Sequence, residues 1–289
     1  MRPTESQCSG LRNQNTDTEN LHTSPEDDVL CTVTKSGIAT LALNRINKHN
    51  AFDANVIQTL NRYLLQLKQR ADIRVLILTA NGKHFSAGAD LNWMKSMAEK
   101  SVDENHEDAT RLANLLSELD NFPTPTIAHI HGSAFGGALG LICCCDIAIA
   151  TAEAQFCLSE VRLGLIPATI GPYVCRTIGQ RQARRYMLTA ERFDSSTAQQ
   201  LGIIHEVRIR YEETQQLLTH FISQLLSNSP QALTQAKALC QLCDNHKIDT
   251  ELKDTTSSLI AEIRVSPHGQ EGLKAFFDKR PPAWSAKHE

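Results

Sequence analysis

Two loops built from small residues constrain this chain most, because each lies between an apolar β-type run and a helical pattern. The first loop, residues 85–90, follows the apolar run 75–79, and the second, residues 131–138, follows the run 126–131. Glycine and alanine let a ligand approach the main chain closely. The first N–H groups of a helix have no partner inside the helix and attract negative charge. The pair of loops therefore predicts an oxyanion hole, in which two backbone N–H groups bind one oxygen atom.

Close packing of a strand against a helix would explain either loop taken alone. The presence of both in one chain favours the ligand site. Neither loop has a Gly-Lys-Ser/Thr end or a GxGxxG pattern after a strand, so neither matches a phosphate-binding fingerprint.

Several segments, these two loops among them, together resemble one known family. They are residues 44–52, 85–90, 132–140, 145–148, 154–167 and 272–281. The chain resembles the crotonase, or enoyl-CoA hydratase/isomerase, superfamily over roughly residues 28–285. The resemblance implies an α/β fold, a spiral of repeated ββα units with a C-terminal helical oligomerisation region. It specifies the reaction less well, because this scaffold hosts several.

We expect three parts along the chain. Residues 1–27 are a polar, acid-containing tail without fixed structure, residues 28–207 form the spiral catalytic core, and residues 208–289 form the helical region. The first 27 residues lack the apolar run of a secretory signal and the basic character of a mitochondrial leader. No run of about 18 apolar residues would span a membrane. These features predict a cytoplasmic protein.

The resemblance implies the main roles in the site. The N–H groups of Ala87 and Gly137 match the pair that binds the thioester oxygen of an acyl-CoA, so that an enolate is stabilised. Hydratases of the family usually carry two glutamates, which would stand at positions 140 and 160. Here Glu160 is present, but position 140 is glycine. Two carboxylates can divide acid and base work on one water molecule, whereas Glu160 alone must do both, unless the substrate or another side chain helps.

Further segments resemble bacterial methylglutaconyl-CoA hydratases. They are residues 143–146, 156–160, 166–173 and 186–193. This likeness implies hydration of a 2-enoyl-CoA, with 3-methylglutaconyl-CoA giving 3-hydroxy-3-methylglutaryl-CoA in leucine degradation. Two alternatives stay open: an enoyl-CoA delta-isomerase that uses one glutamate, and a catalytically weak member that binds acyl-CoA or RNA.

The remaining candidate residues surround the coenzyme A part and the acyl part of the substrate. For coenzyme A they are Arg45, Lys48, Ala51, Ala89, Asp90 and, reaching a neighbouring subunit, Phe276 and Lys279. For the acyl pocket they are Gly136, Gly140, Trp93, Met94, Lys95, Pro167 and Thr169. Lys95 is a candidate for the distal carboxylate of methylglutaconyl-CoA, although the sequence favours a solvated lysine on an exposed helix face.

Composition restricts the partners. The 289 residues carry a formal charge of −3, which argues against a broad nucleic-acid surface. The nine cysteines include a CxxC at Cys240 and Cys243 without a second pair, and His129 and His131 share a strand face, so we expect packing roles and no metal. We expect no prosthetic group, coenzyme A only as part of the substrate, and a homo-oligomer, either a trimer or a dimer of trimers.

Overall fold

The chain winds as a spiral in which successive turns add strands to two sheets. The computed structural model describes residues 18–244 and 246–285. The large sheet has the order β1 (Thr18–Asn20), β2 (Val29–Thr34), β3 (Ile38–Leu43), β4 (Val75–Ala80), β5 (Thr126–Ile130), β7 (Ile147–Thr151) and β10 (Glu206–Arg208). The small sheet has the order β6 (Ser133–Phe135), β8 (Gln155–Cys157) and β9 (Phe193–Asp194). From β3 to β10 the neighbours in the large sheet are parallel. The predicted α/β fold is confirmed.

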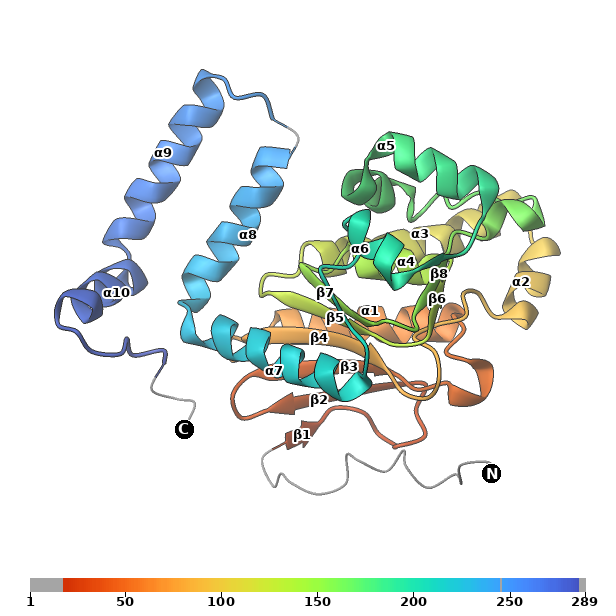
Figure 1. Ribbon diagram of the computed structural model, residues 1–289, viewed down its shortest axis with the longest axis horizontal. Coiled ribbons are helices and arrows are strands. Elements are labelled where there is room, and N and C mark those ends of the chain that lie inside the picture. Colours follow the sequence, from red (N-terminus) through yellow and green to blue (C-terminus); the bar gives the residue numbers. More distant parts are fainter. Residues whose placement is uncertain (1–17, 245, 286–289) are drawn as a thin grey trace.

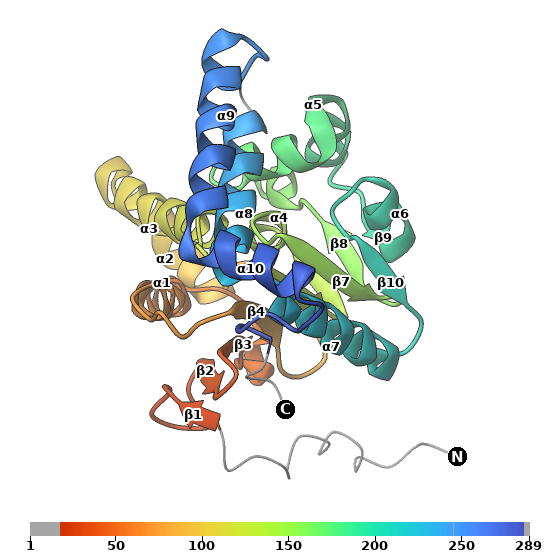
Figure 2. The same ribbon diagram turned by 90° about the vertical axis from the view of Figure 1, so that its left-hand side faces the viewer.

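Helices cover both faces of the large sheet (Figures 1 and 2). α1 (Ala54–Lys68) and α3 (Val102–Asp120) pack together on the face that holds the main core, and α7 (Tyr211–Ser227) packs on the other face. The sequence of β4 is a continuous apolar run because both of its faces are packed. Leu76 and Leu78 enter the main core, while Val75 and Ile77 join the cluster under α7.

The helix α1 begins directly after a capping aspartate, Asp53. The Asp53 carboxylate accepts the N–H of Val56 at 3.0 Å and caps α1. The buried positions of α1 recur at helical spacing: Val56, Ile57, Leu60, Tyr63, Leu64 and Leu67. This packing fixes the loop before α1, which lies beside the candidate site.

Shorter elements connect the sheets around the site. They are the 3-10 helices η1 (Ile46–Lys48) and η2 (Glu160–Leu163) and the helices α2 (Leu91–Ala98), α4 (Gly137–Cys143), α5 (Gly171–Thr189) and α6 (Ser195–Gln200). Gly179, with φ 75°, interrupts α5. The residues before and after Gly179 therefore form two helical parts joined by a kink.

Residues 1–27 were expected to have no fixed structure, and this is wrong for residues 18–20, which form β1. β1 pairs antiparallel with β2, and its Glu19 forms an ion pair with Arg70 at 2.7 Å. Because β1 is an exposed edge strand held by backbone hydrogen bonds, its polar composition did not reveal it. Residues 1–17 of the predicted tail lie outside the described residues.

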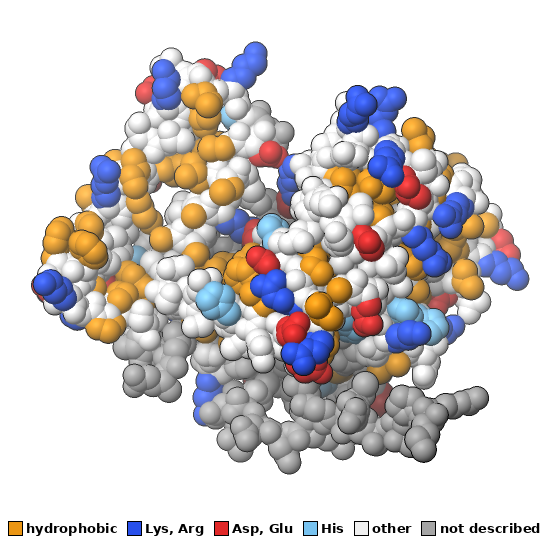
Figure 3. All heavy atoms as spheres, in the orientation of Figure 1, with side chains coloured by type: hydrophobic (Ala, Val, Ile, Leu, Met, Phe, Trp, Pro, Cys, Tyr) orange, Lys and Arg blue, Asp and Glu red, His pale blue; other side chains and the backbone are white. Residues whose placement is uncertain are grey.

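The helices after α7 stand beside the core (Figure 1). They are α8 (Pro230–Asp244), α9 (Thr250–Val265) and α10 (Pro267–Phe277). α8 has no buried residue and α9 buries Leu252. Hydrophobic side chains gather on this part of the surface in Figure 3, and Phe276 and Phe277 are 77% and 75% exposed. The helical C-terminal part thus presents apolar surface to its surroundings.

Candidate functional site

The two small-residue loops lie side by side, as their sequences predicted. The N–H of Phe85 donates to the carbonyl of His131 at 2.9 Å, and that of Ser86 donates to the carbonyl of Ser133 at 3.0 Å. The N–H of Phe135 returns a bond to the carbonyl of Ser86 at 3.0 Å. The first residues of the two loops are therefore held close together.

The structure corrects the expected role of Ala87. Its N–H donates to the carbonyl of His49 at 3.0 Å, so that N–H is already used within the protein. Ala89, two residues after Ala87, has both of its neighbours bonded to Phe52. The N–H of Phe52 donates to the carbonyl of Gly88 at 2.8 Å, and the N–H of Asp90 donates to the carbonyl of Phe52 at 2.7 Å. This bridge leaves the N–H of Ala89 without an acceptor among residues 18–244 and 246–285. Ala89 is exposed, so its N–H can meet a ligand.

The second amide is that of Gly137, the first residue of α4. The preceding Gly136 has φ 56° and ψ −125°, a conformation that favours glycine, and its own N–H donates to Cys157 at 2.9 Å. In the described part of the chain, the N–H of Gly137 has no acceptor. A Cβ on Gly137 would lie 3.8 Å from the Phe52 ring, so this amide and that of Ala89 both border Phe52.

Glu160 brings its carboxylate to the same place. It begins η2, directly after the β8 segment, and a Cβ on Gly136 would lie 3.3 Å from its Oε1. Its Oε2 is buried without a hydrogen-bond partner in the described structure. Burial raises the pKa of the Glu160 carboxyl. A raised pKa favours a carboxyl that accepts a proton and later returns it.

Known proteins share the fold of this chain. The enoyl-CoA hydratase/isomerase family matches residues 33–287. The chain belongs to that family. An enoyl-CoA hydratase structure from Shewanella pealeana superposes with a TM-score of 0.87 at 52% identity, covering 90% of this chain and 97% of that one. A putative enoyl-CoA hydratase/isomerase from Legionella pneumophila gives 0.84 at 46% identity over 89% and 98%. The putative enoyl-CoA hydratase/isomerase YngF of Bacillus subtilis is 32% identical over 88% of this chain and 96% of its own length.

Enzymes of this family act on coenzyme A thioesters without a prosthetic group. Within the described residues, no group of three or more His, Cys, Asp or Glu side chains could hold a metal ion. His129 instead bonds to Thr214 at 2.8 Å and His131 to the carbonyl of Gly82 at 2.8 Å, which confirms their packing roles. Among those same residues, no helix is long and apolar enough to cross a bilayer.

Gly140 occupies the position where a second glutamate is usual in hydratases of this family. A Cβ there would lie 2.3 Å from Cγ2 and 2.8 Å from Cβ of Ile170, and 3.2 Å from Cδ2 of Leu116. Both neighbours are buried. The space for a side chain at position 140 is therefore filled by the core, and a carboxylate could not simply be added.

Four of the predicted coenzyme A residues come together beside the first loop. Arg45, Lys48 and Asp90 line a hollow of about 390 Å³, together with Trp93, and Ala51 lies against it because its carbonyl accepts from Arg45 at 2.8 Å. The carboxylate of Asp90 caps α2 by accepting from the N–H groups of Asn92 and Trp93.

Arg45 is less available to a phosphate than its sequence suggested. Its guanidinium is 13% exposed and pairs with Asp53 at 2.9 Å, Asp28 at 3.3 Å and Asp90 at 3.6 Å. Lys48 is 51% exposed and lies 3.8 Å from Asp90. Of the two cations, Lys48 is the one that can turn to a bound phosphate.

Of the predicted acyl-pocket residues, Gly136 and Gly140 lie before and within α4, and the others lie on α2 and on the loop between η2 and α5. Trp93 and Met94 are half-buried, and the Trp93 indole N–H is buried without a partner among the described residues. Lys95 is exposed on α2. Pro167 and Thr169 are half-buried just before Ile170.

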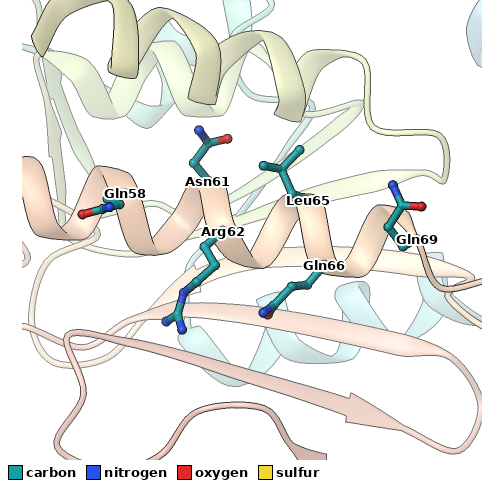
Figure 4. Close-up of a pocket in the computed structure, with 6 residues that line it drawn as sticks. All are labelled: Gln58, Asn61, Arg62, Leu65, Gln66 and Gln69. Atoms are coloured by element: carbon teal, nitrogen blue, oxygen red, sulfur yellow. The ribbon is translucent and has the colours of Figure 1, made fainter. Parts of the chain in front are cut away.

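Phe276 and Lys279 are not brought to this site within one chain. They lie at the end of α10, across the molecule from α2 (Figure 1). A hollow of about 500 Å³ on α1 is also separate from the site (Figure 4). Its lining contains amides and one arginine but no carboxylate: Gln58, Asn61, Arg62, Leu65, Gln66 and Gln69.

Sequence reasoning missed the residues that hold the loops together. Asn50 is buried with φ 55°, and its side-chain N–H groups donate to the carbonyls of Asn81 and His84, both at 2.8 Å. Asparagine tolerates the left-handed conformation. An asparagine inside the loop motif was the available signal, but it carries no chemistry that marks it.

Proposed function

We propose that the protein adds water to a 2-enoyl-CoA through an enolate bound by the N–H groups of Ala89 and Gly137. The observation that supports this best is the Glu160 carboxylate lying against Gly136, next to the Gly137 amide. Two amides on one thioester oxygen lower the energy of the enolate, and loss of one such donor typically costs about 3 to 4 kcal/mol.

Glu160 acts in both proton transfers. Its carboxylate takes a proton from water as the oxygen bonds to C3, and the C2=C3 electrons move to the thioester oxygen. When the enolate collapses, the Glu160 carboxyl gives that proton to C2. The overall reaction adds one water, and dehydration follows the same path in reverse. The raised pKa of Glu160 supports this double role.

The preferred substrate in our proposal is 3-methylglutaconyl-CoA, giving 3-hydroxy-3-methylglutaryl-CoA. Lys95, exposed on the helix that follows Ala89, is the proposed partner of the distal carboxylate. Turnover of methylglutaconyl-CoA and crotonyl-CoA by the purified full chain tests both points. We expect Lys95→Ala to raise KM for methylglutaconyl-CoA alone; an unchanged ratio of the two KM values would remove Lys95 from the site.

Isomerisation is the second candidate, because Ile170 and Leu116 fill the space beside Gly140 and leave one carboxylate to move a proton between C4 and C2. A 3-enoyl-CoA distinguishes the two reactions. An isomerase converts it without adding water, whereas a hydratase leaves it unchanged. Coenzyme A thioester binding without turnover of either substrate would instead indicate a catalytically weak member.

We also propose a homo-oligomer, a trimer or a dimer of trimers, formed through the C-terminal helices. The exposed Phe276 and Phe277 support this, as does the lack of buried residues in α8. Such an assembly would carry Phe276 and Lys279 to the coenzyme A of a neighbouring copy. Free buried thiols, such as Cys143, Cys144 and Cys145, support the proposed cytoplasmic location.

A further inference from the structure

The two small-residue loops, residues 85–90 and 131–138, form what we call the cradle. His84 lies where these two loops meet the loop of residues 45–52. It follows β4 and precedes the first loop, and its Nδ1 accepts the N–H of Ser133 at 3.2 Å. Its carbonyl accepts from Asn50 at 2.8 Å. One residue thus contacts the start of the second loop and the 45–52 loop, whose His49 carbonyl holds Ala87.

The N–H of Ser133 bonds to the imidazole of His84 and not to a backbone carbonyl. Backbone bonds join the loops on either side, at Phe85 with His131 and at Ser86 with Ser133. Between them Gly132 has φ 62°, and a Cβ there would lie 2.0 Å from the carbonyl of Lys83. At this position the N–H of Ser133 bonds to the His84 ring, and the His84 carbonyl accepts from Asn50.

We propose that the neutral imidazole of His84 is a positioning residue for the oxyanion hole, by holding Ser133 and therefore the Gly137 amide in register with Ala89. The effect of His84 on catalysis rests on the proposed enolate chemistry, whereas its contact with Ser133 does not. Ser133 begins β6, which leads directly to Gly136 and Gly137. Loss of the hydrogen bond between Ser133 and His84 would displace the N–H of Gly137 relative to that of Ala89.

The contact requires one protonation state. An amide N–H only donates, so Nδ1 must carry a lone pair and the proton must be on Nε2. The groups that face His84 are His49, with ring centroids 5.4 Å apart, Lys83 and His131, while Glu153 acts on His131. Burial, His49, Lys83 and His131 lower the pKa of His84, which keeps the acceptor available at neutral pH.

The first experiment compares His84→Asn, which retains an acceptor oxygen but does not titrate, with His84→Ala. His106→Asn, at an exposed histidine on α3, controls for loss of a histidine. With a 2-enoyl-CoA, we expect His84→Ala to lower kcat by about ten- to hundred-fold with little change in KM, because small displacements of aligned groups have effects of that size. His84→Asn should restore most of kcat and lose the part of the acidic decline in kcat that comes from His84.

Equal kcat in His84→Ala and wild type at every pH would overturn the proposal, as would a His84→Asn variant as slow as His84→Ala. The near-ultraviolet absorbance of enolised acetoacetyl-CoA reports the cradle without turnover and should weaken in His84→Ala.

The second experiment does not depend on activity or on the alanine variant folding. The ¹⁵N spectrum of histidine-labelled wild type, assigned with His84→Asn, should show His84 with the proton on Nε2 and an accepting Nδ1. A proton on Nδ1 would refute the contact. If wild type hydrates no enoyl-CoA while this spectrum is as expected, the proposed function fails and the Ser133 contact stands.

Discussion

At the scale of single residues, the proposed chemistry depends on Glu160, whose Oε2 is buried without a hydrogen-bond partner in the described structure. We expect Glu160→Gln to lower kcat by about 10²- to 10⁴-fold, the range for loss of a general acid or base. KM should change little, since glutamine keeps the shape of the side chain. Steady-state hydration assays measure both, and a kcat within a few-fold of wild type would assign the proton transfers to another group.

The same variant has a predicted effect on stability. Burial raises the pKa of Glu160 in the folded protein above its ordinary value of 4.5, so the folded state holds the proton more tightly than the unfolded state. The stability contributed by the protonated Glu160 is fully present below its ordinary pKa of 4.5. It is lost as pH rises through the raised pKa of the folded protein. Glu160→Gln should therefore unfold at a higher temperature than wild type at neutral pH, and the advantage should vanish in acid. Equal melting temperatures at neutral pH would contradict a destabilising charge.

Gly140 is constrained by packing as well as by chemistry. A methyl group at position 140 overlaps Ile170, so Gly140→Ala should destabilise the fold by about 1–3 kcal/mol, as overpacked cores do. In an Ile170→Gly background both overlapping atoms are gone, and the same change should cost much less. Urea unfolding of the four proteins gives this coupling.

Gly171 supplies the matched control, because a Cβ there meets nothing within 4 Å. Gly171→Ala should leave stability nearly unchanged. If Gly140→Ala is equally harmless, the core beside position 140 is free to rearrange, and the missing glutamate needs another explanation.

At the scale of elements, α2 is joined to the first loop by Asp90. This carboxylate caps the helix and lies beside Lys48 and Arg45. Asp90→Ala should lower stability by about 0.5–2 kcal/mol and raise KM for acyl-CoA, because Ala89 precedes the lost cap. Asp90→Asn should keep the cap and most of the stability.

The caps of other helices separate the two effects. Asp249 caps α9 by accepting the N–H of Leu252 at 3.0 Å, away from the cradle. Asp249→Ala should cost similar stability and leave KM unchanged. A KM that rises equally in both variants would show that α2 has no special link to substrate binding.

At the scale of the whole molecule, the C-terminal helices expose apolar surface that one chain does not cover. Replacing both Phe276 and Phe277 with aspartate should lower the mass measured by light scattering, because charge at an apolar contact opposes association. Val102, which is 84% exposed at the start of α3, provides a control as Val102→Asp. A wild-type monomer, or an assembly that survives the double change, would contradict association through these residues.

The sequence by itself determined the fold class, the two loops, the Glu160 position and the family, because apolar runs and small-residue loops are local properties. It also predicted packing roles for His129 and His131. Polar composition hid β1, since an edge strand is held by backbone bonds that side chains do not report. Only the tertiary structure decided that the N–H of Ala87 is bound to His49, that the N–H of Ala89 has no acceptor within the described part of the chain, and that Ile170 fills the space beside Gly140. Those three facts depend on which distant segments touch, and the direction of a single peptide group has no signature in the residues that flank it.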